Sequence, residues 1–299
     1  MIKHIFIVNP AAGKGKGLKL IPEIRKILTE KKQEYEIEIT ERPGHAQELA
    51  KIHGGKGENR IYSVGGDGTL NEVLNGMVGT DSSLAVIPCG SGNDFIRSLT
   101  SRWSIEDIVE RTIDGSEKAI DVIKVNDRYF INIASVGFDA EVVYNARKIK
   151  KIPGLPGSVA YILGILSTVF KYGGSYMHIK IDGNRIEKKL LLTAIANGRY
   201  YGGGMLPVPA ARIEDGLIDI CTVDAVSKVK ILAFFPKLIK GTHGDMKEVS
   251  FYKGKRVEIT SNHDMTINTD GEVIRGQEMV FEVIPKGIRI IVPKDDKTS

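Results

Sequence analysis

The first 95 residues pass three times from an apolar run into a glycine-containing turn and then into a helical pattern. The runs cover residues 2–8, 61–64 and 84–88, and the turns begin at Asn9, Gly65 and Cys89. Near-continuous apolar runs are typical of strands buried on both faces of a parallel sheet. Junctions of this kind lie at one carboxyl edge of a doubly wound sheet, so the pattern predicts an α/β domain with a ligand site at that edge.

The second junction has the most informative chemistry, Gly-Gly-Asp-Gly-Thr at residues 65–69. Glycine permits a sharp turn and close approach of the backbone to a ligand. A helix predicted to begin at about Thr69 would direct its unpaired amides toward phosphate oxygens. Because a carboxylate repels phosphate, we expect Asp67 to hold Mg²⁺, directly or through water, or to orient the reacting groups. The alternative is a tight turn in which Asp67 only caps the helix.

The other two turns support a phosphate site less specifically. Residues 9–17 contain two lysines among small residues, but they lack the Walker spacing and a hydroxyl after either lysine. This turn suits a phosphate chain, and a flexible basic turn is the alternative. The third turn, residues 89–95, would place Asp94 at a helix start beside the phosphates.

From about residue 118 the pattern changes to strands separated by short turns, which is typical of antiparallel sheets. For a chain of 299 residues, this change predicts two domains. The first, residues 1–125, has a doubly wound, mostly parallel sheet, with the extreme C-terminus as a candidate to rejoin it. The second, residues 126–299, is an antiparallel β-sandwich. Strands are expected at 118–125, 128–136, 176–182, 188–196, 256–260, 265–269, 279–284 and 288–292, and helices at 139–148, 158–171 and 228–240.

Composition narrows the setting of the protein. The 42 basic and 37 acidic residues give a net charge of +5, which is compatible with a nucleotide or an anionic membrane surface but specifies neither. Cys89 and Cys221 form no metal or redox spacing, which suits a reducing compartment. No uninterrupted apolar run reaches about 18 residues, and the N-terminus lacks the features of a signal peptide. We therefore expect a cytoplasmic protein without a transmembrane helix.

Taken together, the motifs of both halves resemble the diacylglycerol kinase catalytic superfamily, most closely its soluble bacterial lipid kinases of the diacylglycerol kinase B type. The resemblance extends over nearly the whole chain. It implies a nucleotide-binding α/β domain followed by a β-sandwich domain for the lipid substrate, with ATP and Mg²⁺ in the cleft between them. The motifs that carry it, in the family's order, are Asn-Pro-x-x-Gly at 9–13 and the segments 65–72, 90–95, 137–141, 215–217 and 270–272.

Residue by residue, the resemblance implies a general base at Glu272 and further acidic participants around the catalytic Mg²⁺ at Asp67 and Asp94. From the sequence alone, Asp-Gly at 270–271 favours a plain hairpin turn instead. A structural Mg²⁺ site is implied at the carboxylate of Asp215 and the backbone carbonyls of Arg212 and Leu217. The implied ATP contacts are Asn9, Pro10, Ala11, Ala12, Gly13, Thr40, Gly65, Gly66, Asp67, Gly68, Thr69, Leu70, Asn71 and Ser91.

The leading functional hypothesis is therefore an ATP- and Mg²⁺-dependent lipid kinase that phosphorylates the hydroxyl of diacylglycerol to give phosphatidic acid. Phosphatidylglycerol or a sphingoid base is an alternative acceptor. NAD kinases share the Gly-Gly-Asp-Gly-Thr turn, but the turn at 90–95 and the late Asp-Gly-Glu favour a lipid kinase. A nucleotide-binding regulator without turnover would have no need of a base such as Glu272.

A soluble enzyme that acts on a bilayer lipid must dock on the bilayer. Arg147, Lys148, Lys150 and Lys151 precede an apolar stretch at residues 152–170, and basic residues beside exposed apolar ones favour anionic surfaces. The alternative is a helix packed on the sandwich with a solvated charge run at its start. We expect peripheral membrane association and no nucleic-acid partner, and an edge strand of the second domain could support a homodimer.

Overall fold

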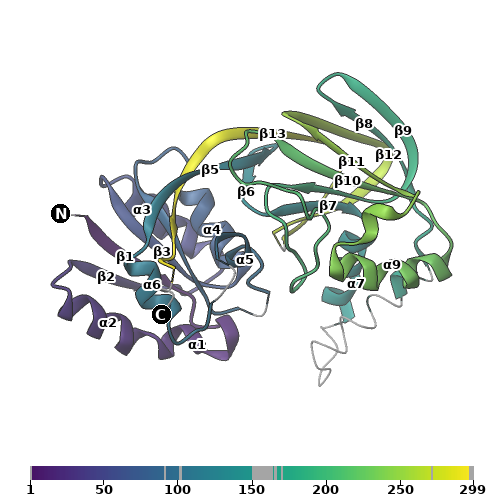
Figure 1. Cartoon of the computed structure of the whole chain (residues 1–299). Coiled ribbons are helices and arrows are strands. Elements are labelled where there is room, and N and C mark those ends of the chain that lie inside the picture. The colour runs from purple at the N-terminus through teal and green to yellow at the C-terminus, as the bar shows by residue number, and fades with distance from the viewer. Residues whose placement is uncertain are drawn as a thin grey trace.

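A computed structural model describes residues 2–90, 92–100, 103–149, 164, 167–169, 171–270 and 272–295. Ser91, Lys150, Lys151 and most of the helix expected at 158–171 lie outside the described residues, as does the side chain of Arg147. Figure 1 shows an N-terminal α/β half that contains both chain ends and a C-terminal half rich in long strands. The long last strand, β13 (Glu272–Val292), extends from one half to the other.

The N-terminal half is built on parallel strands in the order β4-β3-β1-β2. Helix α4 begins at Asp67, two residues earlier than the sequence predicted, because the amide of Leu70 donates to the carbonyl of Gly66 (3.0 Å). The strands are β1 (Lys3–Val8), β2 (Tyr35–Ile39), β3 (Asn59–Gly65) and β4 (Ser83–Pro88). The helices are η1 (Ala12–Lys14), α1 (Lys16–Lys19), α2 (Ile21–Glu30), α3 (His45–Gly54), α4 (Asp67–Met77), α5 (Ile96–Leu99) and α6 (Ile108–Ile113).

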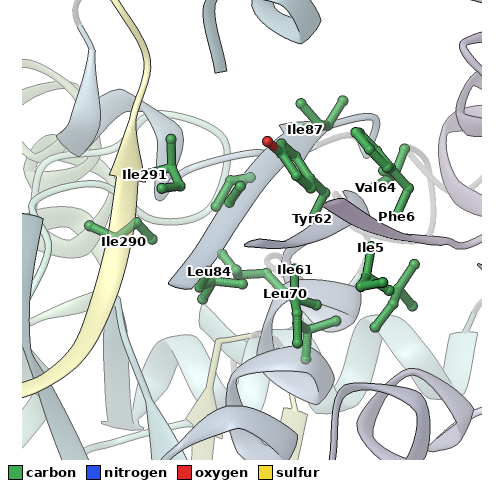
Figure 2. Packing of buried hydrophobic residues seen from close by; sticks show 14 of the residues in the cluster. Ile5, Phe6, Ile61, Tyr62, Val64, Leu70, Leu84, Ile87, Ile290 and Ile291 are labelled. Carbon is green, nitrogen blue, oxygen red and sulfur yellow. The ribbon is translucent and has the colours of Figure 1, made fainter. Parts of the chain in front are cut away.

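The first core lies around these parallel strands. Ile5, Ile61 and Leu84 come from three neighbouring strands, and Leu70 packs with them from α4 (Figure 2). Both faces of the sheet are covered, which explains why β1 and β4 read as continuous apolar runs. The prediction of a doubly wound parallel sheet is confirmed.

The C-terminal strand β13 joins both sheets. Arg289 and Ile290 pair in parallel with β4 on one edge and antiparallel with β5 (Ser116–Val125) on the other, while residues 272–282 pair antiparallel with β12 (Arg256–Thr269). The sequence predicted two strands at 279–284 and 288–292, but these are one strand with a register shift between Ile284 and Ile288. The segments 256–260 and 265–269 are likewise joined in β12 across a shift after Thr260. Such irregularities interrupt the alternation of side chains, so the sequence pattern breaks where the strand does not.

The C-terminal half is an antiparallel sandwich, as expected. Strands β9 and β12 each pair with β7 at one end and with β8 at the other. The predicted strand 128–136 is two strands, and β10 and β11 were not predicted. The elements are β6 (Arg128–Phe130), β7 (Ile133–Gly137), α7 (Phe138–Ile149), β8 (Ser175–Ile181), β9 (Asn184–Ala196), β10 (Ile218–Asp224), α9 (Lys228–Lys240), η2 (His243–Asp245) and β11 (Val249–Gly254).

Two further cores organise this half. One lies within the sandwich and includes Phe130, Ile259 and Phe281. The other lies between β7, β9 and β10 and the helices α7 and α9, and includes Phe138 and Phe234. Within the described part of the chain, no helix is long and apolar enough to span a bilayer.

Candidate active site

Two hollows are each lined by residues at the N-terminus of α4. One, of about 360 Å³, is lined by Asp67 and by apolar side chains of the C-terminal half. The other, of about 310 Å³, is lined by Gly68 and Thr69 together with the first turn and the end of β2. Because α4 contributes to both, a ligand that bridges the hollows would pass its unpaired first amides.

The first turn is fixed onto α4 by one side chain. Asn9 accepts a hydrogen bond from the amide of Ala11 (2.9 Å) and donates to Oγ1 of Thr69 (2.9 Å). Gly13 then brings this turn against the third one, because a Cβ at Gly13 would lie 1.9 Å from the carbonyl oxygen of Cys89 and its φ is +57°. No other residue type could occupy position 13 without moving the backbone.

The second turn meets the third through its own backbone. The amides of Cys89 and Gly90 both donate to the carbonyl of Gly65 (2.7 and 3.2 Å). A Cβ on Gly66 would lie 3.2 Å from Cα of Gly90. The three glycine-containing turns therefore meet at the carboxyl edge of the parallel sheet, as the sequence predicted.

Asp67 does not cap its own helix. Its carboxylate accepts hydrogen bonds from the amides of Asn93 (3.1 Å) and Asp94 (3.1 Å). The N-cap position of α4 is occupied by Gly66, and Asp67 is the first residue of the helix. A Cβ on Gly92 would lie 2.4 Å from Oδ2 of Asp67. The capping alternative is therefore wrong, and Asp67 holds the third turn in place at the mouth of the larger hollow.

Asp94 links the two halves of the molecule across this site. Its buried carboxylate accepts from the amide of Gly203 (3.1 and 2.9 Å), and Nε of Arg97 lies 3.9 Å from Oδ1. Burial raises the pKa of Asp94 above its ordinary value, the Gly203 amide opposes the rise, and the charge of Asp67 adds to it. The partner loop, residues 202–204, was not predicted, although its three consecutive glycines are visible in the sequence. In the structure all three have positive φ.

Asp270 was predicted only as part of the 270–272 motif and its hairpin turn, without a role of its own in the site. It lines the larger hollow, and its carboxylate accepts from the amides of Ile131 (3.1 Å) and Ile133 (3.0 Å). Burial raises the pKa of Asp270 to about 6 even though these amides favour the charged form. Asp67, Asp94 and Asp270 thus bring three carboxylates to a hollow whose lining is otherwise mostly apolar. This charge arrangement favours a bound cation.

Glu272 has a different setting from these three residues. Its Oε2 lies 2.7 Å from Nη1 of Arg128. Glu272 is not among the described residues that line either hollow. Thr269 and Glu272 are paired at the end of the β12–β13 hairpin. Strands β12 and β13 therefore form a hairpin here, the connection that Asp-Gly favours. Glu272 lies next to the carboxylate cluster in sequence, while its own carboxylate is held by an arginine.

The remaining predicted ATP residues divide into two groups. Those that line the smaller hollow are Asn9, Pro10, Ala11, Thr40, Gly68 and Thr69. Ala12 packs against the core, the side chain of Leu70 is buried in that core, and Asn71 donates to the carbonyl of Tyr129 (3.1 Å). Glu72, which was not predicted, also lines the hollow and accepts from the amide of Gly44 (2.9 Å).

The predicted structural metal site is already neutralised by a lysine. Oδ2 of Asp215 lies 2.9 Å from Nζ of Lys253, and Oδ1 accepts from the amide of Leu217 (3.2 Å). The same ammonium lies 3.2 Å from the buried Asp219. Arg212 and Leu217 lie on the same loop and are not among the described residues that line either hollow. In the described part of the chain, a three-ligand acidic cluster occurs instead at Glu36, Glu38 and His53, away from either predicted metal site.

Comparison with protein families accounts for both halves. Residues 3–125 match the diacylglycerol kinase catalytic domain, and residues 132–292 match the YegS C-terminal NAD kinase beta sandwich-like domain. The chain belongs to the YegS-like lipid kinases, and its residues 3–125 are a diacylglycerol kinase catalytic domain. Because the matched relatives are named as kinases of lipids, this protein is a lipid kinase, and the family implies ATP as its phosphoryl donor.

Relatives match this lipid kinase along most of its length. It is 27% identical to a diacylglycerol kinase of Bacillus subtilis over 292 residues, which cover 97% of this chain and 96% of the relative. A probable YegS-like lipid kinase of Shewanella frigidimarina is 30% identical over 239 residues, covering 78% and 76%. A crystal structure of a putative diacylglycerol kinase from Bacillus anthracis superposes with a TM-score of 0.80 at 26% identity, covering 97% and 95%.

Proposed function

We propose that this lipid kinase transfers the γ-phosphoryl group of ATP to the free hydroxyl of a diacylglycerol, giving phosphatidic acid, with Mg²⁺ as the metal ion. The larger hollow carries the proposal. Its walls are apolar side chains from α7, β9 and α9, while its polar end consists of three carboxylates beside the first turn of α4. A lipid acceptor needs both features, an apolar wall for an acyl chain and a polar end for the hydroxyl.

ATP is proposed to occupy the smaller hollow and to extend its phosphates toward α4. Asn9, Thr40 and Thr69 offer polar side chains there, and Gly68 leaves the backbone bare. The first amides of α4 favour negative charge, so the phosphate chain is directed toward the side where Asp67 lies. Transfer then needs the donor and acceptor oxygens held in line, which a site bridging the two hollows provides.

The metal is proposed to bind through Asp67 and Asp94. Both line the polar end of the larger hollow, and oxygen atoms are the ligands that Mg²⁺ prefers. The single positive charge of the nearby Arg97 does not balance the two negative charges of these carboxylates. Magnesium would supply neutralisation of the charge that spreads over the phosphoryl oxygens. A structural magnesium ion at Arg212, Asp215 and Leu217 is a separate proposal, which the ion pair of Lys253 with Asp215 opposes.

A carboxylate next to the acceptor hydroxyl would take its proton. Following the resemblance, we propose Glu272 for this role, which would require its carboxylate to leave Arg128. Asp270 is a second candidate because it already lines the hollow and has a raised pKa of about 6. General-base assistance contributes about 10²- to 10⁴-fold to the rate, so either assignment has a measurable consequence.

Other acceptors remain as proposals of the same class. Phosphatidylglycerol and a sphingoid base each carry a hydroxyl and an acyl or alkyl chain, so the hollow suits them as well. An NAD kinase is disfavoured, since the walls of Leu191, Leu192 and Phe234 suit a hydrocarbon rather than a dinucleotide. A regulator without turnover is disfavoured by the three carboxylates that line the hollow, because they repel the phosphates of a nucleotide and binding alone does not require them.

The test is incorporation of label from γ-labelled ATP into lipid. Purified protein is incubated with Mg²⁺ and mixed micelles that carry diacylglycerol, phosphatidylglycerol or sphingosine in turn, and with NAD in a separate reaction. Labelled phosphatidic acid that is lost in Asp94→Asn supports the proposal. A label found only in another acceptor reassigns the substrate, and ATP binding without transfer to any acceptor would leave the regulatory alternative in its place.

A further inference from the structure

Helix α9 has two opposite apolar faces. Ile231, Phe234 and Leu238 point into the third core, and these side chains also line the larger hollow together with Phe235. At 100° per residue these four positions lie on one side of the helix. A helix on the surface of a protein needs one such face, and a second apolar face requires its own explanation.

The second face is directed to solvent. Val229, Leu232 and Ile239 are 77%, 56% and 54% exposed, and Ala233 and Pro236 between them are also exposed. All five positions fall within about one third of the helix circumference, opposite the buried face. Single exposed apolar residues are normal, whereas a contiguous stripe of large ones marks an interaction surface.

The charge around this stripe is of one sign. Residues 228–240 contain four lysines and no acidic residue. Lys230 is bound to Glu248 (2.6 Å), while Lys237 and Lys240 lie in the last turn and are exposed. Lysine beside an apolar stripe is the pattern of a helix that lies in the interface of an anionic bilayer, since the stems stay in the apolar layer while the ammonium groups reach lipid phosphates.

We propose that α9 docks this kinase on an anionic lipid bilayer, with Val229, Leu232 and Ile239 in the acyl region and Lys237 and Lys240 at the phosphates. The inference rests on the lipid-kinase activity and not on the identity of the acceptor. Since the other face of α9 forms a wall of the larger hollow, docking would place that hollow one helix diameter from the bilayer. In Figure 1, α9 lies beside α7 on the outer side of β10 and β7.

A second copy of the chain is the competing occupant of this face. Oligomers of identical chains are mostly symmetric, so two α9 helices would face each other and bring the lysines of both copies together. Like charges across an interface are unfavourable. An anionic surface removes this conflict, and for this reason a bilayer fits the face better than a dimer.

The test is binding to vesicles, which requires no turnover. Wild type and Leu232→Gln/Ile239→Gln are sedimented with vesicles of phosphatidylcholine alone or mixed with phosphatidylglycerol. We expect wild type to bind the mixed vesicles, and the double variant to bind about 100-fold more weakly, since two aliphatic side chains lose their burial. Lys237→Gln/Lys240→Gln should weaken binding about 30-fold on anionic vesicles only.

The matched control is Ile52→Gln, which replaces an aliphatic side chain of similar exposure (52%) on α3 of the N-terminal half. It should bind as wild type does. Equal binding of wild type and Leu232→Gln/Ile239→Gln, or no binding of wild type to either vesicle, would overturn the proposal. Light scattering that shows a dimer of the wild type and a monomer of Leu232→Gln/Ile239→Gln would also overturn it, because this face would then be the contact between two copies of the chain. None of these measurements depends on kinase activity, so failure of the docking proposal can be told apart from failure of the proposed reaction.

Discussion

The two hollows beside α4 are built in opposite ways. The smaller one is lined by the first turn, the segment after β2 and the start of α4, and the first turn is held by Gly13, where an added Cβ would collide with the Cys89 carbonyl. The larger one is walled by ordinary apolar side chains from α7, β9 and α9, segments far apart in the sequence. Backbone contacts are specified rigidly by glycine, whereas apolar walls tolerate repacking. The phosphate donor site should therefore be intolerant of change, and the acceptor site adjustable.

The largest expected effect concerns the two candidate bases, Glu272 and Asp270. Glu272→Gln should lower kcat by about 10²- to 10⁴-fold if Glu272 is the base. If Asp270 is the base instead, Asp270→Asn should have that effect and Glu272→Gln a small one. The pKa of Asp270, about 6, adds a pH criterion. A base acts when it is deprotonated, so kcat/KM of wild type would rise as the pH increases through about 6. In Asp270→Asn this rise of kcat/KM with pH would be absent.

Asp94→Asn separates catalysis from stability at the contact between the halves. The amide can still accept a hydrogen bond from Gly203 but loses the charge, so kcat should fall by about 10²- to 10³-fold. Because burial raises the pKa of Asp94, the charged form is the costly one in the folded state. The ionised Asp94 carboxylate therefore lowers the free energy of unfolding as the pH rises past the ordinary pKa of an aspartate. The melting temperature of Asp94→Asn at pH 7.5 should equal or exceed that of wild type, and a marked decrease would contradict this account.

Gly13→Ala tests the rigidity of the donor side. Its Cβ would lie 1.9 Å from the Cys89 carbonyl, whereas a Cβ on Gly15, which also has a positive φ (+86°), would meet nothing within 4 Å. Gly15→Ala should therefore cost only the backbone strain, about 1–2 kcal/mol, and Gly13→Ala several kcal/mol more. Denaturant titrations of both variants measure the difference. Equal losses would show that the first turn is not fixed by its contact with Cys89.

Val143→Phe tests the adjustable acceptor side. Val143 is half-buried and lines the larger hollow. A larger side chain should shorten the hollow and lower kcat/KM about tenfold for long-chain diacylglycerols, since a few methylene contacts are worth 1–3 kcal/mol. Short-chain acceptors and the KM for ATP should be unchanged. A change in the KM for ATP would mean that the two hollows are not independent.

The difference between the two hollows also explains which parts of the site could be predicted from the sequence. The parallel sheet and the meeting of its three turns followed from apolar runs and glycines, because those features act locally. The loop at 202–204 and the side chain of Asp270 were missed, since each becomes part of the site only through a contact more than 100 residues away, with Asp94 and with Ile131. The apolar wall was not predictable at all, because Leu192 and Phe234 read as ordinary core residues. The role of Glu272 came from the resemblance and stays a prediction.

The smallest expected effect is at Lys253, outside both hollows, where the resemblance implied a metal ion. Its ammonium lies between Asp215 and Asp219, and burial raises the pKa of Asp219 while the ion pair opposes that rise. Lys253 is 42% exposed, so solvent screens the pair, and Lys253→Met should cost about 1 kcal/mol. If the lysine replaces a metal ion, a chelator will leave the melting temperature of wild type unchanged, and Mg²⁺ will raise that of Lys253→Met alone. A chelator that lowers the melting temperature of wild type would instead establish a structural metal ion beside the lysine. This loop would then tolerate substitution as poorly as the turns of the smaller hollow.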